Sequence, residues 1–103
     1  MAEVIWTENA LVDLNQIAEY IAISNLSAAK KLVDAVFTTV ERLSSHPESG
    51  RKPPEIAHLH YREIILNPCR KFYKFDNERV FVLYGMRQER ELRQFMLAER
   101  SLR

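Results

Sequence analysis

Residues 46–87 constrain the fold more than any other part of the sequence, because they contain three short runs that are typical of β-strands. Polar and apolar residues alternate in the first run, the second is aromatic and basic, and the third is continuously apolar. The runs occupy residues 61–66, 71–75 and 80–84. Asn67-Pro68 and Asp76-Asn77-Glu78 separate them as turns. Loops this short predict antiparallel neighbours, and the third run suits a central strand that is covered on both faces.

Two amphipathic helices are expected before these strands. Their apolar residues recur at spacings of three and four, first at Leu11, Leu14, Ile17, Ala18 and Ile21, and then at Leu32, Val33, Val36, Phe37, Val40 and Leu43. Thr7 can cap the first helix and Ser27 the second, and Pro47 ends the second. The link between them is so short that we predict an antiparallel helical hairpin, whose remaining apolar surface needs another layer to cover it.

The two ends of the chain complete a predicted α+β fold. Residues 4–6 form a short β-type run, and residues 88–100 have a composition that favours a helix. The expected order is β-α-α-β-β-β-α, in which the helical hairpin packs on a small, twisted, mainly antiparallel sheet. Because the chain has only 103 residues, we expect residues 1–103 to form a single domain.

The composition is that of an ordinary globular protein, with 47% hydrophobic and 28% charged residues. Cys69 is the one cysteine, so an internal disulfide is excluded and nothing points to an oxidising compartment. No apolar run approaches the length of about 18 residues that a membrane span needs. Glu3 lies where a signal peptide would carry positive charge. We therefore expect a cytoplasmic protein that does not engage a membrane.

Charge is divided unevenly between the two halves of the chain, although the net charge is only +1. Residues 1–50 hold three Lys/Arg against seven acids, which gives −4, and residues 51–103 hold twelve against seven, which gives +5. The second half can therefore offer a basic face, or it can be a mixed and solvated surface. The sequence pI of 7.9 lies below the value of about 9 that is typical of dedicated nucleic-acid binders, so tight non-specific binding to RNA or DNA is not favoured.

Arginines stand at or near the ends of the predicted turns and strands, at Arg51, Arg62, Arg70 and Arg87. Guanidinium groups bind phosphates and carboxylates through planar forks. We expect Arg62, Arg70 and Arg87 to converge on one face of the sheet. Tyr73 and Tyr84 would then complete a concave surface for a nucleic-acid backbone or for an acidic segment of a protein partner. The structural alternative is that some of these arginines pair with nearby glutamates.

The residues needed for other kinds of chemistry are sparse. His58 and His60 share one side of an extended segment, but structural zinc needs four ligands, and His46 and Cys69 lie elsewhere in the sequence. Cys69 stands beside Arg70, although a nucleophilic cysteine also needs a neighbouring base. The chain has two glycines and hence no glycine-rich phosphate loop, and it shows no suggestive pair of carboxylates. We expect neither a metal nor a cofactor.

Six segments of the chain together form a pattern that is characteristic of a known protein family. They read WTENALVDLNQIAEYIA, SNLSAAKKLVDAV, LSSHPESGRKPPEI, YREI, RKFYKF and VFVLYGMR. This pattern, which covers almost the whole chain, resembles the RelE/ParE superfamily of bacterial type II toxins. The resemblance implies a cytoplasmic toxin that is neutralised by a cognate antitoxin encoded beside it, in a toxin–antitoxin hetero-oligomer.

The resemblance implies one of two activities. RelE-like members cut messenger RNA in the ribosomal decoding site, whereas ParE-like members poison DNA gyrase. The segment SAAKKLVDAV and the turn HPESGR look closer to ParE, which implies that this chain inhibits DNA gyrase by binding and has no chemistry of its own. The candidate residues for binding the target or partner are then Arg51, Arg62, Arg70, Tyr73 and Arg87.

A RelE-like endoribonuclease acting on the ribosome and its messenger RNA is the alternative activity. Cleavage needs a base for the ribose 2′-OH, cations for the phosphorane and an acid for the leaving oxygen. Arg62 and Arg87 match two basic residues of that branch, and Lys52 is a weaker match. No Tyr or His follows Tyr84, so Tyr84 or Tyr73 would have to replace the late tyrosine or histidine of the family. A third alternative is a toxin fold that has lost its toxicity and only holds its antitoxin.

Overall fold

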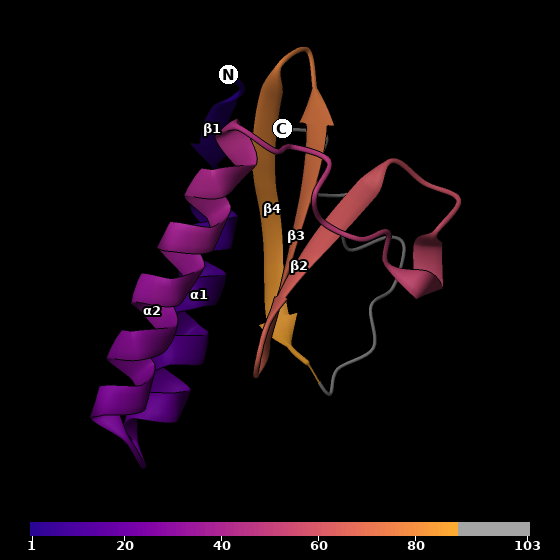
Figure 1. Ribbon diagram of the computed structural model, residues 1–103. Helices are drawn as coiled ribbons and strands as arrows, with labels where there is room; N and C mark the ends of the chain where they lie inside the picture. Colours follow the sequence, from indigo (N-terminus) through magenta and orange to yellow (C-terminus); the bar gives the residue numbers. More distant parts are fainter. Residues whose placement is uncertain (89–103) are drawn as a thin grey trace.

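The computed structural model describes residues 1–88, which form a layer of two helices against one face of a four-stranded sheet (Figure 1). The elements are β1 (Glu3–Trp6), α1 (Glu8–Ala22), α2 (Leu26–Glu41), β2 (Tyr61–Leu66), β3 (Cys69–Asp76) and β4 (Arg79–Arg87), with short 3-10 turns η1 (Arg42–Ser44) and η2 (Pro54–Ile56). The α+β class, the helical hairpin and the β-α-α-β-β-β order of elements along residues 1–88 are confirmed. The helix predicted over residues 88–100 lies, apart from Gln88, outside the described residues.

The sheet has the strand order β1-β4-β3-β2. β2, β3 and β4 pair as an antiparallel meander, and β1 adds to β4 in parallel, with Glu3 opposite Arg79 and Trp6 opposite Val82. The β3–β4 register shifts between Phe72 and Tyr73, which lie opposite Tyr84 and Val82, respectively. β4 is therefore an internal strand, as its continuous apolar run predicts.

The main core lies between the hairpin and the sheet. Its buried members include Leu14 and Ile17 of α1, Val36 and Val40 of α2, and Val80 of β4. A smaller cluster on the opposite face of the sheet holds Ile56, Phe72, Leu83 and Met86. The strands thus bury apolar side chains on both faces. Among residues 1–88, no helix is long and apolar enough to cross a membrane.

Polar side chains set the start of each helix. The Thr7 hydroxyl accepts a hydrogen bond from the Ala10 amide at 3.2 Å, which confirms the predicted cap of α1, and donates to the Val82 carbonyl at 2.8 Å. The predicted cap of α2 at Ser27 is wrong, because Ser27 lies inside the helix and Asn25 accepts from the Ala28 amide at 3.0 Å. Asn25 adopts the extended backbone that an N-cap requires.

Candidate functional site

The candidate cations lie on both faces of the sheet and at different ends of it. Successive side chains of a strand point to opposite faces. Arg62 and Glu63 of β2 therefore diverge, and Arg70 of β3 lies on the Glu63 face because the two side chains are hydrogen-bonded. Arg87 contacts Tyr20 of α1, which places it on the helix side of the sheet. The expected convergence on one face is therefore wrong for Arg70. Arg62 and Arg87 lie opposite Tyr73 and Cys69 of β3, so they share the helix side of the sheet but stand toward different ends of it.

An ion-pair network occupies the face of the sheet away from the helices. Glu63 accepts from Arg51 Nε at 2.8 Å and from Arg70 Nε at 2.7 Å. Both terminal nitrogens of Arg70 reach the Glu55 carboxylate, at 2.8 and 3.0 Å, in a bidentate pair. The Glu63 side chain is fully buried and that of Arg70 is 7% exposed. The network therefore fastens the chain around Arg51 and η2 to the sheet.

All three guanidinium nitrogens of Arg70 donate within this network. Its guanidinium also lies over the Phe72 ring, with Cζ 5.0 Å from the ring centre. The hydrogen bonds to the Glu55 carboxylate raise the pKa of Arg70 further above its ordinary value, and Glu63 adds to the shift against the opposing effect of burial. Arg70 therefore acts as a structural cation, and so does Arg51 through its Nε, although half of the Arg51 side chain is exposed.

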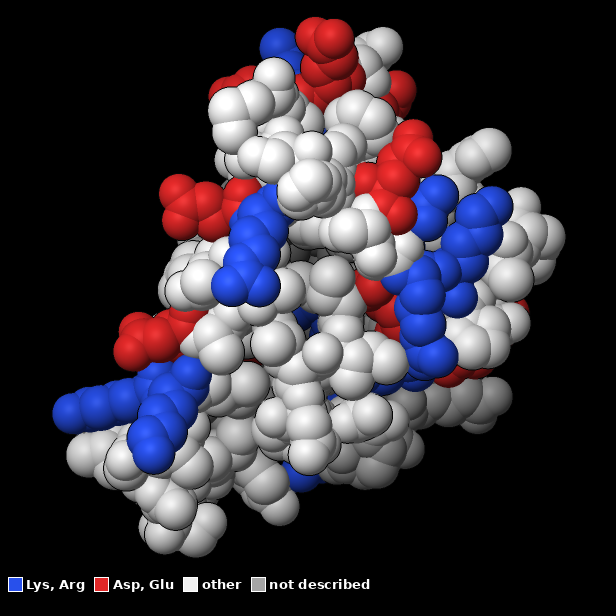
Figure 2. Space-filling model, viewed as in Figure 1, with Lys and Arg blue, Asp and Glu red and all other residues white. Residues whose placement is uncertain are grey.

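A small cleft beside β2 contains three basic side chains. We call it the basic cleft, and it is lined by Glu48, Lys52, His60, Tyr61, Arg62 and Phe75. The cleft has a volume of about 180 Å³. Lys52 and His60 are exposed and Arg62 is half-buried. Figure 2 shows basic side chains gathered on this side of the molecule, over β2 and the segment that precedes it. The cleft combines cations with two aromatic rings, a combination suited to an anionic macromolecular surface.

The segment that carries Lys52 is held against the sheet by Arg62 and Tyr73. Arg62 Nη1 donates to the carbonyls of Gly50 at 2.9 Å and Glu48 at 3.2 Å. The Tyr73 hydroxyl donates to the Pro47 carbonyl at 2.8 Å and accepts from the Gly50 amide at 3.0 Å. Burial raises the pKa of Tyr73. The Tyr73 side chain is buried, so it positions this segment and does not contribute to an open binding surface.

Arg87 and Tyr84 line a second cleft, between α1 and β4. This cleft has a volume of about 360 Å³ and also contains Asp13 and Tyr20. Arg87 Cζ lies 4.5 Å from the centre of the Tyr20 ring. Asp13 accepts a hydrogen bond from the Gly85 amide at 3.0 Å. Both residues therefore line this end of β4, apart from the basic cleft, although the Tyr84 ring packs against Phe72 on the opposite face of the sheet.

The sheet register shows how far apart the two clefts are. One row across the sheet contains Arg62 of β2, Tyr73 of β3 and Val82 of β4. Another row contains Leu66 of β2, Cys69 of β3 and Arg87 of β4. Along β2 these two rows are separated by the four residues from Arg62 to Leu66, which is about 13 Å at the usual rise per strand residue. Arg62 and Arg87 therefore cannot act on one phosphate group in this arrangement.

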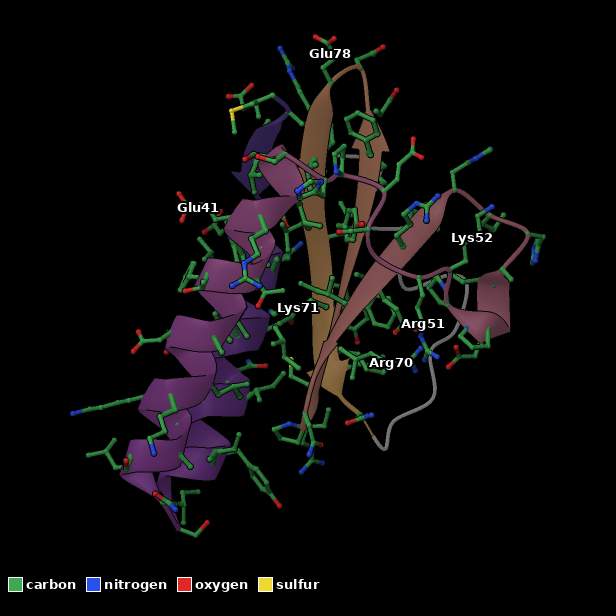
Figure 3. All side chains as sticks on the ribbon, in the orientation of Figure 1. Glu41, Arg51, Lys52, Arg70, Lys71 and Glu78 are labelled. Atoms are coloured by element: carbon green, nitrogen blue, oxygen red, sulfur yellow. The ribbon has the colours of Figure 1, made fainter. Side chains whose placement is uncertain are left out.

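Lys71 is a buried cation that sequence reasoning does not identify. It extends between the sheet and α1 (Figure 3), with Nζ 3.4 Å from the Ala10 carbonyl oxygen and 5.3 Å from the centre of the Trp6 ring. Gly85 leaves room for it, because a Cβ at Gly85 would lie 2.5 Å from Lys71 Nζ. The signal was available, since Lys71 occupies an inward position of a strand, but Lys71 contributes to the core and not to a surface site.

Cys69 is the first residue of β3 and is completely buried. Burial raises the pKa of its thiol, so the group stays protonated and unreactive at neutral pH. Within residues 1–88, no three His, Cys, Asp or Glu side chains come together in a way that could hold a metal ion.

The structure places His60 and Glu63 in contacts that the sequence did not predict. The sequence links His60 to His58 through their spacing, whereas the fold places His60 beside Lys52 and Arg62. Glu63 joins two arginines, and its apolar neighbours in a half-buried strand could have identified it as a buried, and hence paired, carboxylate.

Comparisons with known proteins each find a toxin or a toxin–antitoxin system. The family described as ParE toxin of type II toxin-antitoxin system, parDE, matches residues 4–92. Toxin RelE2 of Caulobacter vibrioides is 35% identical over 68 residues, which cover 66% of this chain and 73% of that protein. A solved chain of the chromosomal ParDE TA system from P. aeruginosa has a TM-score of 0.69 at 22% identity, covering 86% of this chain and 98% of that one. This structural match shows a shared fold.

Proposed function

The chain belongs to the ParE toxin family of type II toxin-antitoxin systems, and we propose that it inhibits DNA gyrase by binding, without catalysis of its own. Family membership implies an antitoxin as its partner. The proposal treats residues 1–103 as one toxin domain that acts in the cytoplasm, where gyrase works.

The observation that best supports binding over catalysis is the separation of the candidate catalytic residues. Lys52 and Arg62 line the basic cleft, whereas Tyr84 and Arg87 line the cleft between α1 and β4. Tyr73, the other candidate acid or base, is buried and hydrogen-bonded to the backbone of Pro47 and Gly50. General acid–base catalysis requires its groups within hydrogen-bonding reach of one reacting centre. This arrangement does not meet that requirement.

The basic cleft is the surface that we assign to the target. The exposed side chains of Lys52 and His60 lie beside Arg62, whose Nη1 holds the backbone of Glu48 and Gly50. The loop is therefore preorganised, which reduces the entropy lost on binding. Basic side chains on such a fixed loop favour an acidic surface on the target, through faster and more specific association.

The test is a supercoiling assay with purified DNA gyrase and the full-length toxin. We expect loss of supercoiling, with cleaved DNA trapped on the enzyme, at micromolar toxin. The doubly substituted toxin Lys52→Ala/Arg62→Ala should inhibit more weakly, whereas Arg79→Ala, at the far β3–β4 turn, should inhibit like wild type. Unchanged supercoiling with wild-type toxin would count against gyrase as the target.

An endoribonuclease is the second candidate, and the grouping of His60 with Lys52 and Arg62 supports it. In that case Lys52 and Arg62 would hold the phosphate, and His60 would transfer the proton. Translating ribosomes incubated with toxin and analysed by primer extension would show cuts within codons, and His60→Ala would abolish them. The absence of such cuts with wild-type toxin would eliminate this candidate.

A further inference from the structure

His60 is an exposed side chain of the basic cleft, and within residues 1–88 no hydrogen bond or ion pair occupies its ring. Lys52, Arg62 and Glu48 line the same cleft. Histidine ordinarily changes its charge between about pH 5 and pH 8, whereas lysine, arginine and glutamate keep theirs over most of that range. The protonation of one ring therefore sets how basic the cleft is.

The charges around His60 show how much one proton matters. The loop before β2 contributes Lys52 and Glu48, and β2 contributes Arg62. These two cations and one carboxylate sum to +1, and a protonated His60 raises the sum to +2. Phe75 of β3 adds an uncharged ring to the lining. Protonation of His60 therefore doubles the net charge that a partner meets in the cleft.

The other charged groups near the cleft are directed elsewhere or already paired. Lys74, beside Phe75 on β3, extends over the Phe81 ring, with Nζ 5.6 Å from the ring centre. Arg51, beside Lys52, bonds through its Nε to Glu63 at 2.8 Å. Tyrosine, which also lines the cleft, is ordinarily uncharged at these pH values. The change of charge in the cleft near neutral pH therefore depends on His60.

The chemistry of the cleft favours a single carboxylate over a chain of phosphates. Glu48 belongs to the lining, and its negative charge opposes a polyanion. The sequence pI of 7.9 is also below the value typical of nucleic-acid binders. The cleft volume of about 180 Å³ lies below the range of about 300–1,000 Å³ that is usual for small-molecule sites. Such a cleft suits one projecting acidic side chain of a protein.

We infer that His60, when protonated, pairs with a carboxylate on the surface of the target protein, so that binding strengthens as the pH falls through the neutral range. This inference rests on the proposed binding of DNA gyrase. The protonated ring joins Lys52 and Arg62, and three cations then face the acidic surface. Because the carboxylate prefers the charged ring, the complex takes up a proton as it forms. His60 thus determines specificity in a manner that the pH controls.

The test measures the affinity of the full-length toxin for purified DNA gyrase, without DNA, at about pH 6 and pH 8. His60→Gln carries no charge at either pH, so the ratio of wild-type to His60→Gln affinity cancels the titration of gyrase itself. This ratio should be about fivefold larger at the lower pH, a typical effect of one exposed charge. His58→Gln is the matched control, since His58 is exposed and lies outside the lining. It should keep the wild-type pH dependence.

Two further variants separate charge from shape. His60→Lys carries the charge at both pH values, so it should bind about as tightly at each as wild type does at the lower one. Glu48→Gln should strengthen binding about threefold at both and keep the pH dependence, since the Glu48 carbonyl still accepts from Arg62. Calorimetry in buffers of different ionisation enthalpy should show proton uptake by wild type near neutral pH, and none by His60→Gln from this position.

The outcomes separate this inference from the proposed function. If wild-type toxin binds gyrase at neither pH, the proposed function fails and the inference fails with it. If it binds with the same pH dependence as His60→Gln, the inference fails alone. Equal losses of affinity in His60→Gln and His60→Lys would mean that the ring acts through its shape, which overturns the inference. A pH effect that requires added DNA would assign the anion to a phosphate and also overturn it.

Discussion

The two groups of basic residues beside β2 differ in what surrounds them. Arg51 and Arg70 meet the Glu63 carboxylate, and Arg70 also meets Glu55, so their charges are compensated within the protein. Lys52 and His60, in the basic cleft, are exposed. Arg51 and Lys52 are adjacent in sequence, so the density of basic residues does not distinguish the two groups. The carboxylate on the same sheet face determines which cation is structural and which can meet a partner.

The largest effect is expected from Glu63→Ala. Within residues 1–88, this substitution leaves Arg70, which is almost completely buried, with Glu55 as its one carboxylate partner, and it removes the partner of Arg51 Nε. Breaking a buried pair costs about 3–5 kcal/mol. We therefore expect the free energy of unfolding, measured by urea denaturation, to fall by about that amount. Glu3→Ala is the control, because the Glu3–Arg79 pair is exposed and 3.6 Å long, and it should change stability by less than about 0.5 kcal/mol. Equal losses would mean that the network is not structural.

Gly50→Ala should have the next largest effect. A Cβ at this position would lie 2.6 Å from the Tyr73 hydroxyl oxygen and 2.7 Å from the Glu63 carbonyl oxygen, so the backbone must move. Overpacking of this kind costs about 1–3 kcal/mol. The shift would also displace Lys52, so target inhibition should weaken together with stability. Ser49→Ala, at the exposed neighbouring residue, should affect neither quantity. A fully stable Gly50→Ala variant would show that the loop is not held tightly.

The adjacent residues Arg51 and Lys52 give the most direct test of the comparison. Lys52→Ala should weaken gyrase inhibition about fivefold, a typical value for one exposed charge of about 1 kcal/mol, and should leave the urea midpoint unchanged. Arg51→Ala should do the reverse, lowering the midpoint and sparing inhibition, because its Nε is bonded to Glu63. If both substitutions weaken inhibition equally, Arg51 also contacts the target and the distinction between the two groups fails.

The smallest effect concerns alkaline pH and the hydroxyl of Tyr73. Burial raises the pKa of Tyr73 in the folded state above the ordinary value of about 10. The unfolded chain therefore ionises first, so this contribution to stability is complete below pH 10 and is lost as the pH rises through the raised pKa. The free energy of unfolding, measured by urea denaturation between pH 9 and pH 11, should fall by at most about 1.4 kcal/mol per pH unit from this group.

Tyr73→Phe should flatten that slope, although it lowers stability at every pH by removing two hydrogen bonds. Burial also raises the pKa of Cys69, which acts in the same direction, so both proteins should carry Cys69→Ala. An unchanged slope in Tyr73→Phe would assign the alkaline loss to other groups.

Local patterns in the sequence predicted the elements well. The alternation over residues 61–66 and the Asn67-Pro68 turn correspond to β2 and its turn. Thr7 was predicted as a cap because a single candidate stands there, whereas Ser24, Asn25 and Ser27 compete for the start of α2, and composition alone does not choose among them.

The site was harder to predict, because it depends on strand register and on a long loop. The two-residue turn between β2 and β3 places Arg70 opposite Ile65. Ile65 shares its face of the sheet with Glu63, because side chains alternate along a strand, so Arg70 and Arg62 must lie on opposite faces. No local rule could predict that residues 48–52 return to β2. That approach depends on Tyr73 and Arg62, which bind backbone groups of the loop from another part of the chain.

The parallel pairing of β1 with β4 has a consequence for how this protein matures on the ribosome. The first strand finds its partner only in residues 79–82, and the Thr7 hydroxyl bonds to a carbonyl 75 residues later. Contacts between residues so far apart in the sequence can form only after almost the entire chain has been synthesised. Before residues 79–82 have been made, the chain can form the helical hairpin but cannot complete the sheet. The complete fold, with β1 paired to β4, can therefore form only near the end of the chain's own synthesis.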